Sequence, residues 1–309
     1  MAEVTAALVK QLREQTGAGM MDCKAALKVA DGVLEAATDW LRTQVLAAAA
    51  KKAGRIAAEG LVGTRGEGLR GALVEVNSET DFVARNDDFQ TLVATVAELA
   101  LGAGGDLDRL LQAKVPASGR SVADEITQTV AVIGENIQLR RTAVVEVAEG
   151  VVGAYTHAAL APGLGKIGVL VGVQSAGDPE QLATLGRQLA MHVAASRPVA
   201  VSADRIGARA LERERTIYAE QARESGKPEA IIDKIVEGRM RKFYEEVVLL
   251  EQAFVVDPDL KVKDAVDRVA EAIGSSITIT AFERFTLGEG VEPQPGGNLA
   301  DEVAKLAGG

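Results

Sequence analysis

The stretch ALVEVNSETDFVARN, from Ala72 to Asn86, connects a predicted strand to a predicted helix. Its first five residues form the short apolar run that is typical of a buried strand. The residues that follow, DDFQTLVATVAELAL, repeat apolar side chains at the three- and four-residue spacing of an amphipathic helix. Phe82 therefore lies in a corner between strand and helix, where polar residues are usual. The corner thus raises the question of what a large apolar ring does there.

A second copy of this pattern occurs further along the chain. GVLVGVQSAGDP at 168–179 aligns with GALVEVNSETDF at 71–82, and EGVVG at 149–153 aligns with EGLVG at 59–63. Each copy contains a strand, a glycine-rich turn, a buried strand and a corner before a helix. Internal repetition of this kind indicates two related subdomains, each a small sheet with helices packed on it.

The repeat also supplies a comparison for the corner. Asp81 aligns with Asp178, and an aspartate just before a helix is a natural N-cap. Phe82 aligns with Pro179, and proline is favoured at the first position of a helix, whereas phenylalanine has no such local reason. Packing in the protein's own core would also account for Phe82. The comparison favours insertion into a partner's pocket.

The rest of the chain also predicts the α+β fold class. Residues 3–45 predict three short helices, with Gly17 and Gly32 ending the first two, and a helical linker follows at 47–60. Further helices are predicted within 87–101 and 121–134. Gly-Lys-Pro at 226–228 lies between two charge-dense helical patterns and predicts the tip of a protruding antiparallel helical hairpin. A last helix is predicted at 262–273, followed by a strand at 276–282.

The chain is predicted to divide into four parts. These are a three-helix domain at 1–54, a core N-subdomain at 55–140, a core C-subdomain at 141–290 and a flexible tail at 291–309 with a short helix in NLADEVAKLAGG. The core C-subdomain is predicted to contain an arm at about 203–251 and a C-terminal module at about 260–290.

Composition excludes several classes of function. The chain has 34 basic and 44 acidic residues and a net charge of −10, which argues against nucleic acid as the main partner. A single cysteine, Cys23, permits no intramolecular disulfide and fits a reducing compartment. The first residues lack the layout of a signal peptide, and no apolar run approaches the ~20 residues of a membrane helix. These features predict a cytoplasmic protein that does not bind membranes.

Several motifs suggest chemistry that their context does not support. GEGLRG at 66–71 and GLGKIG at 163–168 match the glycine spacing of a dinucleotide-binding loop, but a strand follows each one instead of a helix. Two histidines and one cysteine offer no metal-ligand cluster, so no metal and no cofactor are expected. Cys23 and His192 lie in helical patterns and are interpreted as structural. His157 alternates with Tyr155 on a strand, and both hydrogen bonding and a partner contact remain open for it.

Longer stretches carry a resemblance to a known family. LREQTGAGMMDCKAAL (Leu12 to Leu27) and EVNSETDFVAR (Glu75 to Arg85) resemble two signature segments of the translation elongation factor Ts family. GENIQLRR at 134–141, MHVAASRP at 191–198 and EGRMRKF at 237–243 resemble further segments of it, in the same order. The resemblance covers the chain up to about Gly290.

The resemblance implies both a fold and a function. It implies a ubiquitin-associated (UBA)-like three-helix domain, a core of two related subdomains, a helical arm and a C-terminal module. It implies a guanine-nucleotide exchange factor, without bond-making catalysis, that binds the GTPase elongation factor Tu directly and releases its GDP. Whether a homodimer or a heterotetramer with that GTPase forms is left open.

The resemblance also implies roles for particular residues. The corner Thr80, Asp81, Phe82 and Val83 would enter the GTPase beside its Mg²⁺ and phosphate site. There Asp81 would disturb the magnesium shell and Phe82 would wedge between helices. Arg13, Met20 and Met21 would dock on the nucleotide domain, and His157 would face another domain of the GTPase.

Two other functions compete with this reading. A docking protein of the ribosome or of a chaperone could use the bundle and the arm, and it would bind without affecting a nucleotide. A dinucleotide enzyme would retain its cofactor and would need a glycine loop between a strand and a helix, which the sequence opposes.

Overall fold

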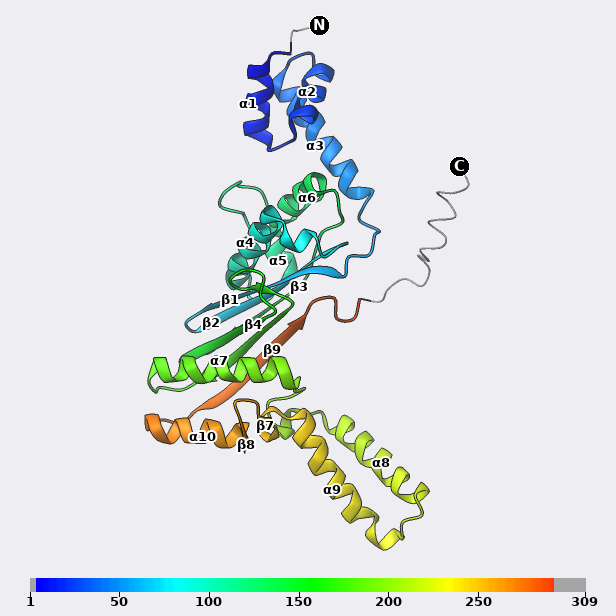
Figure 1. Ribbon diagram of the computed structural model, residues 1–309, viewed down its shortest axis with the longest axis vertical. Helices are drawn as coiled ribbons and strands as arrows, with labels where there is room; N and C mark the ends of the chain where they lie inside the picture. The colour runs from blue at the N-terminus through cyan, green and yellow to red at the C-terminus, as the bar shows by residue number, and fades with distance from the viewer. Residues whose placement is uncertain (1–3, 292–309) are drawn as a thin grey trace.

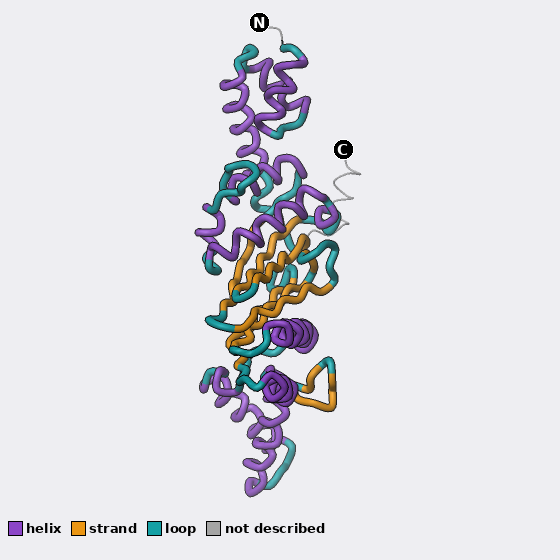
Figure 2. The backbone as a smooth tube through the Cα atoms, turned by 90° about the vertical axis from the view of Figure 1, so that its left-hand side faces the viewer, coloured by secondary structure: helices purple, strands orange, loops and turns teal. Residues whose placement is uncertain are grey.

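The computed structural model describes residues 4–291. Figure 1 shows an elongated molecule, with a bundle of helices at the N-terminal end, sheets in the middle and a pair of helices at the far end. The two larger sheets lie in the central part of the molecule, as the view turned by 90° shows (Figure 2). Helices combined with antiparallel sheets confirm the predicted α+β class. No helix in the range 4–291 is long and apolar enough to cross a membrane.

The first three helices form the N-terminal bundle: α1 (Ala6–Thr16), α2 (Met20–Val29) and α3 (Leu34–Ala50). Thr5 caps α1 by accepting a hydrogen bond from the N–H of Leu8, and Gly17 ends α1 in the left-handed conformation with φ 71°. The bundle has a small core of its own, built from Val9, Leu12, Ala18, Cys23, Ala26, Leu27, Ala37 and Leu41. Cys23 is fully buried there, which confirms its interpretation as a core residue.

The connection from the bundle to the sheets differs from the prediction. The helical pattern predicted a linker helix over 47–60, but α3 ends at Ala50 and turns follow it. Lys52 donates a hydrogen bond to the carbonyl oxygen of Gly134, and the chain then extends into the first strand at Glu59. A tertiary contact at Lys52 and the start of the sheet therefore take precedence over local helix propensity.

The first sheet has the strand order β3-β2-β1-β5. Its strands are β1 (Glu59–Glu67), β2 (Arg70–Ser78), β3 (Gln138–Glu146) and the short β5 (Leu164–Gly165), and β1 and β2 form the predicted hairpin. Between β2 and β3 come α4 (Asp87–Ala103), α5 (Leu107–Gln112), which the sequence did not predict, and α6 (Val122–Ile133). β2 is buried from Gly71 to Ser78 because α4 covers one face of the sheet and the second sheet covers the other.

The second sheet has the order β4-β6-β9, formed by β4 (Gly150–His157), β6 (Ile167–Gln174) and β9 (Thr278–Thr286). Helix α7 (Pro179–Ser196) packs on its outer face, and α10 (Val262–Ile273) packs beyond it (Figure 1). Between the sheets lies a shared apolar layer of Val62, Leu73, Val145, Val147, Val152, Leu170 and Phe285.

The two sheets repeat each other down to single residues. Gly60 and Gly150 both have a left-handed backbone, with φ of 118° and 109°. A Cβ atom at either position would collide with a carbonyl oxygen of the neighbouring strand, that of Val76 or Val173. Both sheets also contain a bulge at the same place, between Glu75 and Val76 in the first and between Gly172 and Val173 in the second. The repeat continues further than the sequence indicated, because α10 and β9 occupy the places of α6 and β3.

The residues between α7 and α10 are an insertion into the second copy of this repeat. They form α8 (Ala208–Glu224), α9 (Glu229–Val247), and the small strands β7 (Ala253–Phe254) and β8 (Asp257–Lys261). Figure 1 shows α8 and α9 side by side, extending away from the sheets. Position 140, suggested as a subdomain boundary, lies inside β3. Residues 278–286, assigned to a C-terminal module, pair along their length with β6. The predicted helix in NLADEVAKLAGG lies outside the described residues.

Candidate partner-binding site

The corner after β2 presents an exposed aromatic ring. Phe82 is 77% exposed, more than any other large apolar side chain among residues 4–291. The chain around it is well fixed: the Oγ of Ser78 donates a hydrogen bond to the carbonyl oxygen of Thr80 at 3.0 Å. On the other side the N–H of Arg85 donates to the carbonyl oxygen of Phe82 at 3.1 Å. We call residues 79–82 the corner tip.

A carboxylate from another part of the chain holds this tip in place. Glu135, in the loop between α6 and β3, accepts a hydrogen bond from the N–H of Thr80 at 2.9 Å and one from its Oγ1 at 2.7 Å. Hydrogen bonds to an ionised acceptor are stronger than those between neutral groups. Thr80 is therefore fixed in both backbone and side chain, which limits the movement of the two residues after it.

A second set of contacts braces the same corner. Glu79 accepts a hydrogen bond from the N–H of Asn136 at 2.6 Å and pairs with Arg55 at 3.4 Å. The side-chain amide of Asn136 donates to the carbonyl oxygen of Arg55 at 2.6 Å. The corner tip, the linker after the bundle and the loop before β3 are thus tied together.

Beyond Phe82 the chain turns back into the core. Val83 and Ala84 are each 5% exposed and pack in the core beneath α4. The resemblance implied that Val83 contacts a partner, whereas this structure places its side chain in the protein's own core. Only Asp81 and Phe82 of the four corner residues have exposed side chains.

The interpretation of Asp81 as an N-cap is wrong. A short 3-10 turn at Val83–Arg85 separates it from α4, and the cap of α4 is Asn86, whose side chain accepts a hydrogen bond from the N–H of Phe89 at 3.0 Å. In the second copy Asp178 does cap α7, by accepting from the N–H of Gln181 at 2.9 Å. The inserted turn frees the carboxylate of Asp81, which has no hydrogen-bond or ion-pair partner among residues 4–291.

A buried charge supports the strand that leads to the corner. Glu75 is fully buried and pairs with Arg140 at 3.0 Å and Arg141 at 2.6 Å. Burial alone would raise the pKa of Glu75, but hydrogen bonds from the N–H of Gly288, from Arg141 and from Asn77 hold the pKa below its usual range. The carboxylate is therefore ionised at neutral pH and ties β2 to β3 and to the chain after β9.

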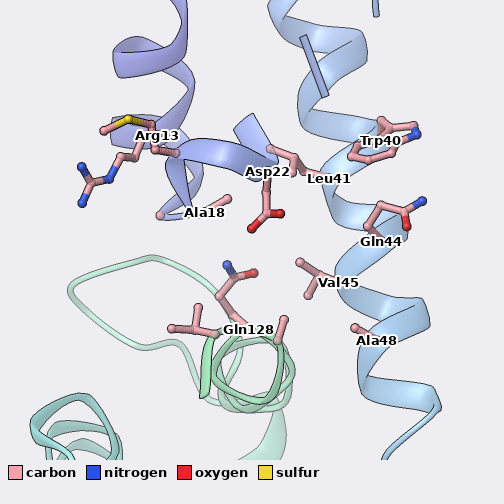
Figure 3. A pocket seen from close by; sticks show the side chains of 14 residues that line it. Arg13, Ala18, Asp22, Trp40, Leu41, Gln44, Val45, Ala48 and Gln128 are labelled. Atoms are coloured by element: carbon pink, nitrogen blue, oxygen red, sulfur yellow. The ribbon is translucent and has the colours of Figure 1, made fainter. Parts of the chain in front are cut away.

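Arg13, Met20 and Met21 lie on the bundle, away from the corner tip in sequence and on different elements. Met20 and Met21 are 60% and 73% exposed. Arg13 and Met20 line a cavity of about 650 Å³ between the bundle and α6. Figure 3 shows Asp22 of α2 and Gln128 of α6 pointing toward one another across this cavity, with Val45 on its α3 side.

His157 lies at the end of β4, and its Nδ1 is 3.2 Å from the hydroxyl oxygen of Tyr155. It is exposed and on a different sheet from the corner tip. His192, by contrast, is fully buried, which confirms its structural interpretation. No group of histidine, cysteine or acidic residues within 4–291 could hold a metal ion.

Sequence reasoning missed the residues that hold the corner tip in place. Glu135 and Asn136 lie 55 and 57 residues beyond the groups they bind. No local sequence pattern predicts such a contact. Both residues do lie within GENIQLRR at 134–141, one of the segments that resemble the elongation factor Ts family.

The exposed apolar side chains of Phe82, Met20 and Met21 are features typical of a surface that binds another protein. The family described as Elongation factor TS matches residues 79–289. Similar curated proteins include elongation factor Ts of Rhodospirillum centenum, 56% identical over all of both chains, and that of Rhodospirillum rubrum, 57% identical over 99% of each. Elongation factor Ts of Agrobacterium fabrum is 54% identical over the full length of both. The chain belongs to the elongation factor Ts family.

Proposed function

We propose that this protein is the nucleotide exchange factor of translation elongation that binds elongation factor Tu·GDP directly and promotes release of GDP. The family supports the general role, and the exposure of Phe82 on a fixed corner is the observation that carries the mechanism. In this mechanism the ring of Phe82 enters the GTPase between two helices and the free carboxylate of Asp81 disturbs the magnesium shell. The protein itself makes and breaks no bonds.

The energetics require more than one contact. To weaken a bound nucleotide by roughly 10⁴, the protein must bind the open GTPase ~5.5 kcal/mol more tightly than the closed one. Burying one phenylalanine side chain contributes only about 1.5–3 kcal/mol. The remainder comes from a wider contact surface and from the loss of magnesium contacts to the phosphates. Linkage makes the coupling reciprocal, so GDP weakens this protein's binding by the same factor.

The wider surface is proposed to use separate parts of the fold. The UBA-like bundle would contact the nucleotide domain through Arg13, Met20 and Met21, and His157 would contact a second domain. Thr80 and Val83 act indirectly in this mechanism, since Thr80 is bound to Glu135 and Val83 is buried. The protruding arm of α8 and α9 has no assigned contact. We place the protein in the cytoplasm, where the GTPase acts.

The test is to mix the protein with elongation factor Tu loaded with a fluorescent GDP and to follow nucleotide release by stopped flow. The proposal expects release to accelerate with the concentration of this protein. Tight binding with unchanged release would instead support the alternative of a ribosome- or chaperone-associated docking protein.

A further inference from the structure

The bundle meets the core where α3 packs beside α6, and this contact is loosely packed. Two cavities, of about 650 and 420 Å³, lie between the bundle and α6. Figure 3 shows Val45 and Ala48 of α3 on one side of the larger cavity and Gln128 of α6 on another. Well-packed interiors contain few voids larger than a water molecule, so packing alone does not fix the position of the bundle on the core.

The two helices that face each other across these cavities are held together at their C-terminal ends. α3 ends at Ala50, and Lys52 in the linker after it donates a hydrogen bond to the carbonyl oxygen of Gly134, the C-cap of α6. Ala49, in the last turn of α3, packs against the core cluster that also contains Val83. The linker at 51–58 and the end of α6 therefore have fixed positions relative to one another.

The three residues after α6, 134–136, contact both this linker and the corner tip, and we call them the connecting loop. Gly134 accepts the hydrogen bond from Lys52 of the linker. Glu135 accepts hydrogen bonds from both the N–H and the hydroxyl of Thr80 in the tip. Because the connecting loop follows α6 directly, its position depends on that of the helix beside the bundle.

Asn136 is the residue of the connecting loop that binds both segments at once. It is 3% exposed, its N–H donates to Glu79 of the tip at 2.6 Å, and its side-chain amide donates to the carbonyl oxygen of Arg55 in the linker at 2.6 Å. Arg55 and Glu79 also pair directly at 3.4 Å, but a partly exposed ion pair contributes little by itself. Buried hydrogen bonds are costly to break, so Asn136 carries most of this connection.

We propose that the connecting loop transmits the position of the bundle to the corner tip, with Asn136 as the positioning residue. A displacement of the bundle moves α3 and the linker, and the hydrogen bonds at Lys52 and Arg55 pass this movement to residues 134–136. In the exchange reaction, and therefore resting on the proposed function, docking of the bundle on the GTPase sets the direction in which Phe82 enters. A connection of this kind is established by a coupling energy between the two sites.

Hydrogen exchange in the free protein tests the connection without the GTPase. Val45→Asp places a charge in the cavity and displaces the bundle, so the N–H of Thr80 should exchange faster by about threefold or more. The amides of β2 should be unaffected, which excludes a general loss of stability. Val29→Asp, at an α2 side chain that is 64% exposed and outside the cavity lining, should leave Thr80 unchanged. An unchanged N–H of Thr80 in Val45→Asp would overturn the proposal.

The same measurement in an Asn136→Ala background locates the connection. Val45→Asp should then have no further effect on the N–H of Thr80, because the connecting loop no longer binds the linker through this side chain. An undiminished effect of Val45→Asp in that background would contradict the role of Asn136.

A second pair of variants serves if Asn136→Ala does not fold. Lys52→Met combined with Arg55→Gln removes two contacts of the linker at side chains that are not fully buried, and it should weaken the effect of Val45→Asp on Thr80. Lys51→Met combined with Arg109→Gln removes the same charge from exposed positions and should preserve the full effect. Equal effects in these two backgrounds would refute transmission through the linker.

A double-mutant cycle tests the use of this connection in GDP release. Independent sites change free energies additively, so Met21→Ala and Phe82→Ala would then multiply in their effects on the release rate. Because the connection joins them, the combined slowing should be smaller than that product by about threefold or more, and it should approach the product in an Asn136→Ala or a Lys52→Met, Arg55→Gln background. Asn136→Ala should also lower the maximal release rate more than it raises the concentration for half-maximal release. Multiplicative effects in the native protein would refute the role of the connection in exchange.

Failure of this inference and failure of the proposed function give different results. If Thr80 responds to Val45→Asp but the native protein does not accelerate GDP release, the connection stands and the proposed function fails. If the native protein accelerates release and Thr80 does not respond, the proposed function stands and this inference is refuted.

Discussion

The carboxylate of Glu135 accepts both hydrogen bonds that Thr80 can donate, from its N–H at 2.9 Å and from its hydroxyl at 2.7 Å. One side chain from the loop before β3 thereby orients the residue that precedes Asp81 and Phe82. The exposed ring of Phe82 is therefore held in position by a contact from Glu135, which lies 55 residues further along the chain than Thr80.

Glu135→Ala should loosen the corner tip. Hydrogen bonds to a charged group contribute about 1.5–3 kcal/mol each, reduced here by partial exposure, so we expect the free energy of unfolding to fall by ~1–3 kcal/mol. The folded variant should also accelerate GDP release from the GTPase less than the native protein does, because the corner tip is no longer held in place. Stopped-flow release with fully folded protein measures the effect, and Glu149→Ala, at an exposed carboxylate, is the control. Equal release rates for the two variants would show that the support is dispensable.

Phe82→Ala should leave folding intact and impair exchange. The ring is 77% exposed, and surface substitutions usually change stability by less than ~0.5 kcal/mol. GDP release should slow more than binding to the nucleotide-free GTPase weakens, because the ring is proposed to open the nucleotide site while the wider contact surface supplies most of the binding. Val199→Ala, at an apolar side chain that is 72% exposed elsewhere, should change neither. Unchanged release with Phe82→Ala would refute the wedge.

Val83→Ala should behave in the opposite way to Phe82→Ala. Its side chain is buried, and removing a buried valine side chain costs about 1.5–3 kcal/mol, so thermal stability should fall. Exchange measured well below the melting temperature should change little, because this side chain packs in the protein's own core. Calorimetry beside stopped-flow release tests this, and a large loss of exchange with native stability would show that Val83 contacts the partner after all.

We expect the free energy of unfolding to depend on pH because of the buried His192. Its Nδ1 accepts a hydrogen bond from the N–H of Val255 at 3.1 Å, so the ring is neutral and its Nε2–H donates to Gln252 at 2.9 Å. Burial lowers the pKa of His192, and the hydrogen bond to Gln252 offsets this only in part.

Because the folded pKa of His192 lies below the unfolded value of about 6.5, the unfolded state takes up the proton first. Stability is therefore complete above that value and is lost as the pH falls from it toward the folded pKa. Urea unfolding between pH 5 and 8 should show this loss for the native protein and for His157→Ala, which alters the other histidine. His192→Gln should remove this component, and persistence of the component in that variant would assign it to another group.

Substitution of the two equivalent glycines, Gly60 and Gly150, should reduce stability by similar amounts. Gly60→Ala and Gly150→Ala should each destabilise the protein by ~3 kcal/mol or more, because both positions have positive φ and a carbonyl oxygen fills the space of the Cβ. Gly238→Ala, in α9 with open space around it, should stabilise by about 0.5–1 kcal/mol. Chemical denaturation of the three variants tests the equivalence of the two sheets. Tolerance at one of the paired positions alone would show that the copies differ in their constraints.

The sequence by itself determined the elements with strong local signals. The hairpin of β1 and β2, the bundle helices and the bounds of α10 follow from apolar periodicity and from glycine placement. The repeat of the two sheets was visible as aligned segments, and the mismatch of Phe82 with Pro179 pointed to an exposed ring. These features depend on residues close together in the chain, where period and turn chemistry act directly.

Only the tertiary structure decided what depends on contacts between distant residues. The 3-10 turn that frees Asp81, the hold of Glu135 on Thr80 and the burial of Val83 could not be inferred from the corner alone. The early end of α3 at Ala50, where Lys52 bonds Gly134, is of the same kind. A hydrogen bond across 55 or 82 residues leaves no periodic trace in the sequence, since its partners are brought together only when the core between them is packed.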